Sequence, residues 1–141
     1  MHTYVQATHE SVGGGTIAQC LSSPVLVLLA MKKVSHKDVK GTSPEGTKGV
    51  DFRPLLAENV DPPNYYLRVF DIAPGGNTPL HTHAWEHEVY VVSGKGKIVL
   101  DKREEPLAEG DAVFVEPNEV HQFVNDSRCN MRMICVIPKP K

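Results

Sequence analysis

The stretch that decides the fold is GGNTPLHTHAWEHEVYVVSG, residues 75–94. Its second half is rich in the β-branched and aromatic side chains that strands favour, and it ends in a glycine-rich reversal. Before that half, His81 and His83 stand two residues apart. Because the side chains of an extended chain alternate between its two faces, we expect both imidazoles to point to the same side.

The same alternation selects a third histidine. His87 shares a face with Val89 and Val91 of the next strand, whereas Glu88 falls on the opposite face. The turn at residues 84–85 is the point where this parity count can fail. The pattern therefore predicts that His87, and not Glu88, points inward.

A metal site in a barrel also needs a ligand from a distant strand, and His121 is the candidate. It follows the turn at residues 117–118 and shares parity with Phe123 and Asn125. Four neutral imidazoles suit borderline divalent ions such as zinc, copper, iron and nickel, whereas manganese usually favours oxygen ligands. The sequence thus predicts one divalent ion per chain, without fixing its identity.

From Tyr65 onward, short strand-like runs alternate with turn signals, whereas helical periodicity is nearly absent. The predicted strands are residues 65–72, 87–93, 96–101, 112–115, 120–125 and 130–137. Residues 40–49 carry Gly, Pro, Ser and Thr without periodicity and are expected to form a loop. This pattern predicts the all-β class, as an antiparallel sandwich or barrel.

Length and charge limit the alternatives. A chain of 141 residues has the size of one domain, and its 15 basic and 17 acidic residues are scattered, which argues against a nucleic-acid partner. The three cysteines show no metal-binding spacing and fit a reducing cytoplasm. The apolar run at residues 24–31 is shorter than the roughly 20 residues of a membrane span. We therefore expect a cytoplasmic protein with no membrane partner.

Residues 1–30 differ in composition from the rest of the chain. They hold a triple glycine and no lysine or arginine, and they end in an aliphatic run. They are interpreted as an N-terminal arm, either a flexible tail or an extra strand that protects a sheet edge, its own or a second subunit's. The barrel is then expected to occupy residues 31–141.

The histidine-bearing segments resemble the two sequence motifs of the cupin family. In the first, glycines at 75 and 94 frame His81 and His83 at the family's spacing, but His87 stands where the motif has glutamate. In the second, running from Gly110 through His121 to Asn125, the overall spacing is kept. There Glu116 takes the usual proline place, Pro117 is displaced by one position, and Asn118 replaces a glycine.

Within that family, residues 31–141 are most similar to small one-domain prokaryotic cupins in which four histidines bind manganese. The resemblance implies a double-stranded β-helix (jelly roll), a homodimer, and an ion at the barrel centre with open coordination positions. It favours manganese, held by His81, His83, His87 and His121. It also places a cysteine near the metal, here Cys135.

Four neutral ligands leave the charge of the ion uncompensated, which makes it a stronger Lewis acid and leaves positions for a substrate. The leading hypothesis is therefore a manganese- or iron-dependent oxidoreductase of dioxygenase type, acting on a small organic molecule. The alternatives are a non-catalytic module that binds a small ligand through its metal, and a sugar isomerase or epimerase. Candidate pocket residues are Arg68 for an anionic group, and Phe123, Met133 and Cys135 for an apolar wall.

Overall fold

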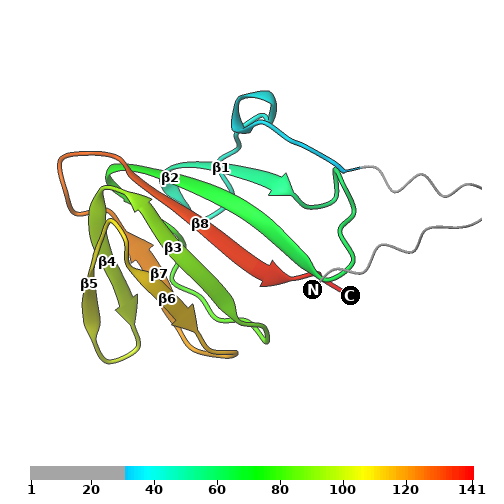
Figure 1. Ribbon diagram of the computed structural model, residues 1–141. Helices are drawn as coiled ribbons and strands as arrows, with labels where there is room; N and C mark the ends of the chain where they lie inside the picture. The colour runs from blue at the N-terminus through cyan, green and yellow to red at the C-terminus, as the bar shows by residue number, and fades with distance from the viewer. Residues whose placement is uncertain (1–30) are drawn as a thin grey trace, which may run out of the picture. The chain divides into compact units, whose positions relative to one another are not determined.

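The computed structural model describes residues 31–141, which fold into eight antiparallel strands and one short 3-10 helix (Figure 1). In chain order these elements are η1 (His36–Asp38), β1 (Lys48–Leu56), β2 (Tyr65–Asn77), β3 (His87–Ser93), β4 (Lys95–Leu100), β5 (Glu104–Ala108), β6 (Ala112–Val115), β7 (His121–Val124) and β8 (Met131–Pro138). The N-terminal arm predicted for residues 1–30 lies outside the described residues.

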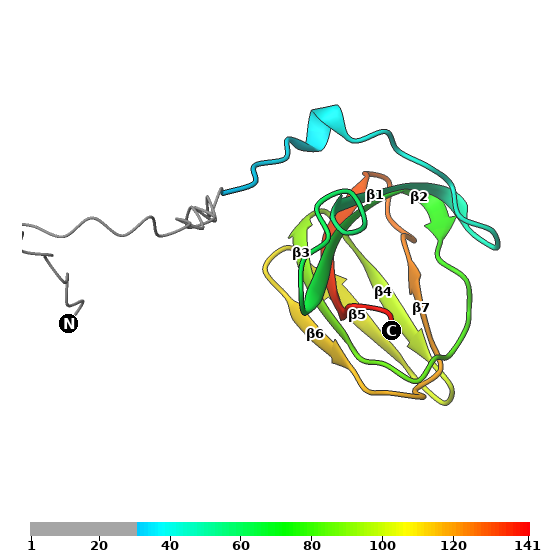
Figure 2. The same cartoon turned by 90° about the vertical axis from the view of Figure 1, so that its right-hand side faces the viewer.

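The long strand β2 connects the two parts of the sheet. The hydrogen-bonded order of the strands is β5-β4-β7-β2-β8-β3-β6. Strand β1 pairs in addition with β2 and lies outside this order. Strand β2 pairs with β8 from Tyr65 to Ile72, whereas its last residue, Asn77, pairs with Val124 of β7. The sheet therefore curls, and its strands surround a common interior when seen end on (Figure 2). This architecture is an antiparallel jelly roll, the fold that the resemblance implies.

Strict alternation of side chains fills the interior. In β8 every second side chain is buried, from Met131 through Met133 and Cys135 to Ile137. In β3 the buried set is His87, Val89 and Val91. Each buried aliphatic side chain contributes roughly 1.5–3 kcal/mol to the hydrophobic stabilisation of the fold.

Two strands were not predicted, and one is longer than predicted. Strand β1 contains Gly49 and Pro54, and β5 contains Pro106, which are residues that weaken a strand pattern. Both strands form because they pair along their length with β2 or β4. Residues 40–49 are thus a loop only until β1 begins, and β2 continues beyond the expected end at residue 72.

The tight reversals need residues that tolerate a positive φ. Gly94 adopts φ 83°, and a side chain there would collide with the carbonyl oxygen of Asn130, 2.3 Å from an ideal Cβ. Asn118 adopts φ 66° at the place of the motif glycine. Asparagine therefore adopts the left-handed conformation at the place where the family motif has glycine.

The outer face of β3 and β6 exposes large apolar side chains. Tyr90, Val92 and Phe114 are 48%, 36% and 59% exposed. The homodimer implied by the resemblance stays a prediction.

No helix in residues 31–141 is both long and apolar enough to cross a bilayer.

Candidate metal centre

Three different parts of the chain bring four histidines together. His81 and His83 lie on the segment after β2, His87 begins β3, and His121 begins β7. The main chains of His81 and His121 form an isolated β-bridge, which joins the first and last of these positions. His87 is buried and Glu88 is exposed, so the parity count holds across the intervening turn.

The imidazole rings form a closed cluster. The ring centroids of His81 and His121 are 4.6 Å apart, those of His83 and His87 are 4.4 Å apart, and those of His87 and His121 are 5.0 Å apart. Candidate ligand atoms of His81, His83 and His121 all lie within 4.8 Å of one another, and His87 is outside that tighter set. The four predicted ligands therefore share one site, in which three are closely convergent.

Backbone carbonyls fix the tautomers of three of these rings. The Nδ1 atoms of His81, His83 and His121 lie 2.9, 2.7 and 2.8 Å from carbonyl oxygens of Pro79, Trp85 and Glu119. A carbonyl oxygen can only accept, so each Nδ1 carries the proton and each Nε2 keeps its lone pair. All three rings therefore use main-chain acceptors and not side-chain carboxylates.

The free nitrogens fit a metal ion. Within the described chain, the Nε2 atoms of His83, His87 and His121 are buried and have no hydrogen-bond partner. A buried polar atom without a partner costs roughly 1–3 kcal/mol, so a cluster of such atoms needs an occupant. Neutral imidazole nitrogens are good ligands for borderline divalent ions. The donor set therefore fits one such ion.

The protonation states agree with that role. Burial lowers the pKa of His83 and of His121 below the ordinary value. Burial, followed by the charge of Arg68, lowers the pKa of His87 to about 2. These rings therefore stay neutral, which is the state that binds metal.

Behind His87 lies a short chain of polar contacts. Arg68 donates from Nη2 to Sγ of Cys135 over 3.0 Å, and Sγ lies 3.3 Å from Nδ1 of His87. Burial raises the pKa of the Cys135 thiol. Cys135 therefore lies directly beside a candidate ligand, as the cupin resemblance implies.

A small cavity of about 280 Å³ opens beside the cluster. All four pocket residues proposed from the sequence line it, namely Arg68, Phe123, Met133 and Cys135. Phe52 of β1 and Phe70 of β2 complete the apolar wall. Phe52 was not predicted because β1 was not predicted. Its aromatic side chain between the charged Asp51 and Arg53 is the alternating pattern that could have indicated a strand with Phe52 facing inward.

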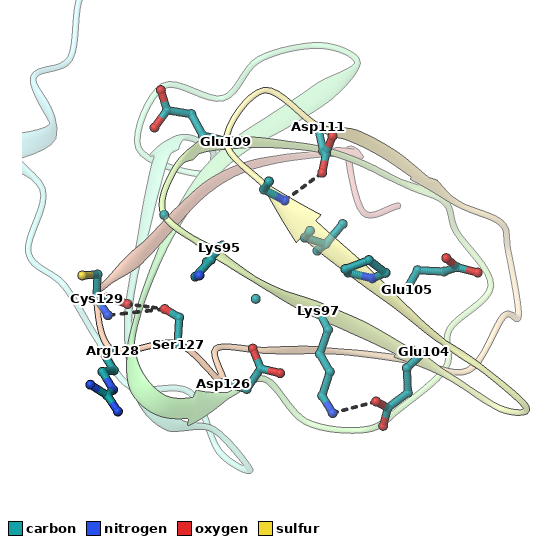
Figure 3. A pocket seen from close by; sticks show the side chains of 15 residues that line it. Lys95, Lys97, Glu104, Glu105, Glu109, Asp111, Asp126, Ser127, Arg128 and Cys129 are labelled. Carbon is teal, nitrogen blue, oxygen red and sulfur yellow. Dashed lines mark hydrogen bonds and ion pairs between the residues drawn. The ribbon is translucent and has the colours of Figure 1, made fainter.

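A larger hollow, of about 1280 Å³, is lined by residues of β4, β5 and the loops beside them (Figure 3). It is lined by charged groups of both signs, and some of them already have partners. Lys97 binds Glu104 at 2.6 Å, and the carboxylate of Asp111 accepts from the amide of Ala108 at 2.7 Å. No histidine of residues 31–141 lines this hollow. The smaller cavity, with its convergent imidazoles, is therefore the candidate site.

Comparison with known proteins agrees with this geometry. The family described as Cupin domain matches residues 68–137. The structure of the polyketide cyclase RemF from Streptomyces resistomycificus is 34% identical, with a TM-score of 0.72, over 79% of this chain and 81% of that chain. A cupin 2 domain-containing protein from Halorhodospira halophila is 30% identical, with a TM-score of 0.59, over 72% of this chain and 75% of that one.

Curated relatives are more distant and longer. Auxin-binding protein 1 of Arabidopsis thaliana is 25% identical over 76% of this chain and 51% of its own length. This chain spans about half the length of the curated relatives it matches. Taken together, the motif-bearing barrel, the matched family and the structures at 30% identity or more show that the chain belongs to the cupin superfamily.

Proposed function

We propose that this cupin is a metal-dependent enzyme that acts on a carbonyl group of a small, largely apolar organic molecule. Its four imidazoles, those of His81, His83, His87 and His121, hold one divalent ion, with manganese favoured. The observation that carries the proposal is the group of buried, unpartnered Nε2 atoms beside an apolar cavity. Pockets of this kind, apolar with a few convergent polar groups, are typical of small-molecule sites.

When bound, the ion supplies Lewis-acid polarisation of a substrate oxygen, and the uncharged ligands leave its positive charge undiminished. The protein positions the ligand nitrogens by tying three Nδ1 atoms to backbone carbonyls. Phe123 and Met133, 3% and 1% exposed, keep water from one wall of the cavity. Cys135 holds its proton at Sγ between Arg68 and His87, because burial raises its pKa.

The absence of a general base among the described cavity residues narrows the reaction class. No Asp, Glu or Lys lines the cavity within residues 31–141. A sugar isomerase or epimerase needs such a group. The side chain of Glu88 is exposed, and that of Lys97 is bound to Glu104. A ring closure of a substrate that is already an enol or phenol fits better. Its nucleophilic carbon adds to a polarised carbonyl, and the proton of its own O–H passes through water to the new alkoxide, so that no protein base is needed. The likeness to a polyketide cyclase supports this choice.

The manganese- or iron-dependent oxidoreductase of dioxygenase type is the second candidate. It is favoured by the apolar wall around Phe123 and Met133, because dioxygen is itself apolar and partitions into such a cavity. A non-catalytic module that binds a small ligand through its metal uses the same residues without turnover.

One experiment separates these functions. The protein is purified without added metal, its metal content is measured by mass spectrometry, and it is then incubated with β-diketones, polyketide-like phenols and small alkenes. Product formation without oxygen uptake is expected. Product formation coupled to oxygen uptake would favour the oxidoreductase, and stoichiometric metal without product would favour the binding module. Failure to bind any divalent ion would contradict all three.

A further inference from the structure

Within residues 31–141, Arg68 has no carboxylate partner. It lies in the middle of β2, opposite Cys135 of β8, and lines the cavity beside the histidines. Its Nη2 donates to the Cys135 sulfur, and its Nε is buried without a hydrogen-bond partner. A guanidinium has five donor hydrogens, so this contact leaves most of its donor capacity unused.

Two neighbouring arginines show what the fold otherwise provides. Arg132 of β8 donates two hydrogen bonds to the carboxylate of Asp71, of 2.6 and 2.9 Å. Arg53 of β1 reaches the carboxylate of Asp51 at 2.8 Å. No ion pair of Arg68 is present in residues 31–141, and no Asp or Glu lines its cavity. Among these three arginines, only the one in the cavity lacks a counter-charge.

An uncompensated charge in a half-buried, apolar site is costly. The guanidinium lies over two aromatic rings, with its central carbon 6.0 Å from the centroid of Phe52 and 5.5 Å from that of Phe70. Ring faces attract a cation, but an exposed contact of this kind contributes only about 0.5–1 kcal/mol and more when desolvated. The rings hold the guanidinium in place without neutralising it. The remaining positive charge is available to an occupant of the cavity.

We propose that Arg68 binds the anionic group of the substrate, and that the substrate is an aromatic carboxylate. A carboxylate matches the planar guanidinium with two parallel bonds. The aromatic body follows from the apolar wall formed by Phe52, Phe123 and Met133. The volume of the cavity, about 280 Å³, lies just below the roughly 300–1,000 Å³ of typical small-molecule sites, so the occupant is small.

This inference rests on the proposed function for its second anchor. One end of the substrate is held by Arg68, and a carbonyl or hydroxyl oxygen at the other end faces the imidazole cluster. The carboxylate site itself is part of the polypeptide and exists without metal. The two proposals can therefore fail separately.

The test is isothermal titration calorimetry. The affinities for benzoate, salicylate and naphthoate are compared with those for the corresponding neutral amides, in both metal-free and metal-loaded protein. We expect the acids to bind about tenfold or more tightly than the amides, since a bond to a charged partner is stronger than a neutral one. Arg68→Met should remove that difference and leave metal content unchanged. Arg68→Lys should restore part of it, because the charge remains without the fork.

The matched control is Arg103→Met, which removes an exposed arginine whose closest carboxylate, that of Glu105, is 3.8 Å away. It should bind the acids as the wild type does. Equal affinity of the wild type for acids and amides would overturn the inference, and this comparison needs no variant to fold. Retained preference for acids in Arg68→Met would overturn it as well. A preference that depends on Arg68 in a protein that binds no metal would support the inference and contradict the proposed function.

Discussion

The main chains of His81 and His121 are hydrogen-bonded to each other in both directions, with N–O distances of 3.1 and 2.9 Å. This bridge is the physical link between the two cupin motifs. It sets two imidazoles side by side although their residues are far apart in the sequence. The geometry of the site therefore depends on the two segments that carry these residues, and on the turn that leads into each.

The turn before His121 gives the first prediction. The amide of Asn118 donates to the carbonyl of His83 at 2.7 Å, and Asn118 adopts φ 66°. Replacing Asn118 by Ala should lower the free energy of unfolding by about 1 kcal/mol, because alanine lacks the short polar side chain that lets asparagine adopt the left-handed conformation. Asn118→Gly should cost less than Asn118→Ala, since glycine adopts this conformation freely. Thermal and urea unfolding measure both changes, and equal losses in the two variants would show that φ is not the cause.

A second prediction concerns the pH dependence of the metal-free protein. An unfolded histidine has a pKa of about 6.5, whereas burial lowers the pKa of His83, His87 and His121 in the folded chain. Below about pH 6.5 the unfolded state therefore binds more protons. The free energy of unfolding should fall as pH falls, by up to about 1.4 kcal/mol per pH unit for each histidine.

Urea unfolding of the metal-free protein between about pH 7.5 and pH 5.5 measures this slope. The His87→Gln variant is the control. Its free energy of unfolding should depend less steeply on pH, by the contribution of one histidine, because it lacks the ring whose pKa is lowered to about 2. Stability that is constant over this range would mean that the three rings take up protons in the folded protein as readily as in the unfolded chain.

Much of this site could be predicted from sequence, and the remainder depends on contacts between distant residues. Parity places His87 inward because alternation is a local property of an extended chain. The Nδ1 acceptors could not be chosen in advance, because any carbonyl or carboxylate near the strand would serve. The series Arg68, Cys135 and His87 is likewise not local, since it joins side chains from β2, β8 and β3.

The missed strands show the same limit. Pro54 and Pro106 weaken a strand pattern, yet each lies opposite a strand residue, Arg68 and Lys97 respectively. Pairing with a long neighbour therefore overrides the local preference. Because β1 was not predicted, Phe52, the aromatic residue that it contributes to the cavity, was not predicted as a pocket residue either.

A third prediction tests the loop after β7. Asn125 is fully buried, and its amide nitrogen donates to the carbonyls of Ile72 and Cys129, each at 2.7 Å. Asn125→Ala should lower the free energy of unfolding by about 2–4 kcal/mol, because both acceptors lose their donor. Chemical denaturation measures the loss. A loss below about 0.5 kcal/mol would show that water replaces the amide without cost.

A fourth prediction concerns Trp85, whose indole stacks on the His83 ring with centroids 4.3 Å apart and planes 4° from parallel. The indole covers one face of a partly exposed candidate ligand. Trp85→Ala should accelerate metal release to a chelator several-fold with little change in stoichiometry, and Trp85→Phe should release metal at an intermediate rate. Equal release rates in all three proteins would show that the stack does not shield the site.

The most direct test of the four-imidazole centre is the metal content of the wild type, His87→Ala and Glu88→Ala, purified in parallel and measured by mass spectrometry. His87 is 7% exposed beside the cluster, whereas Glu88, the neighbouring residue, points outward. We predict one divalent ion per chain in the wild type and in Glu88→Ala, and a loss of at least half of it in His87→Ala. Full metal in His87→Ala together with loss in Glu88→Ala would contradict the account.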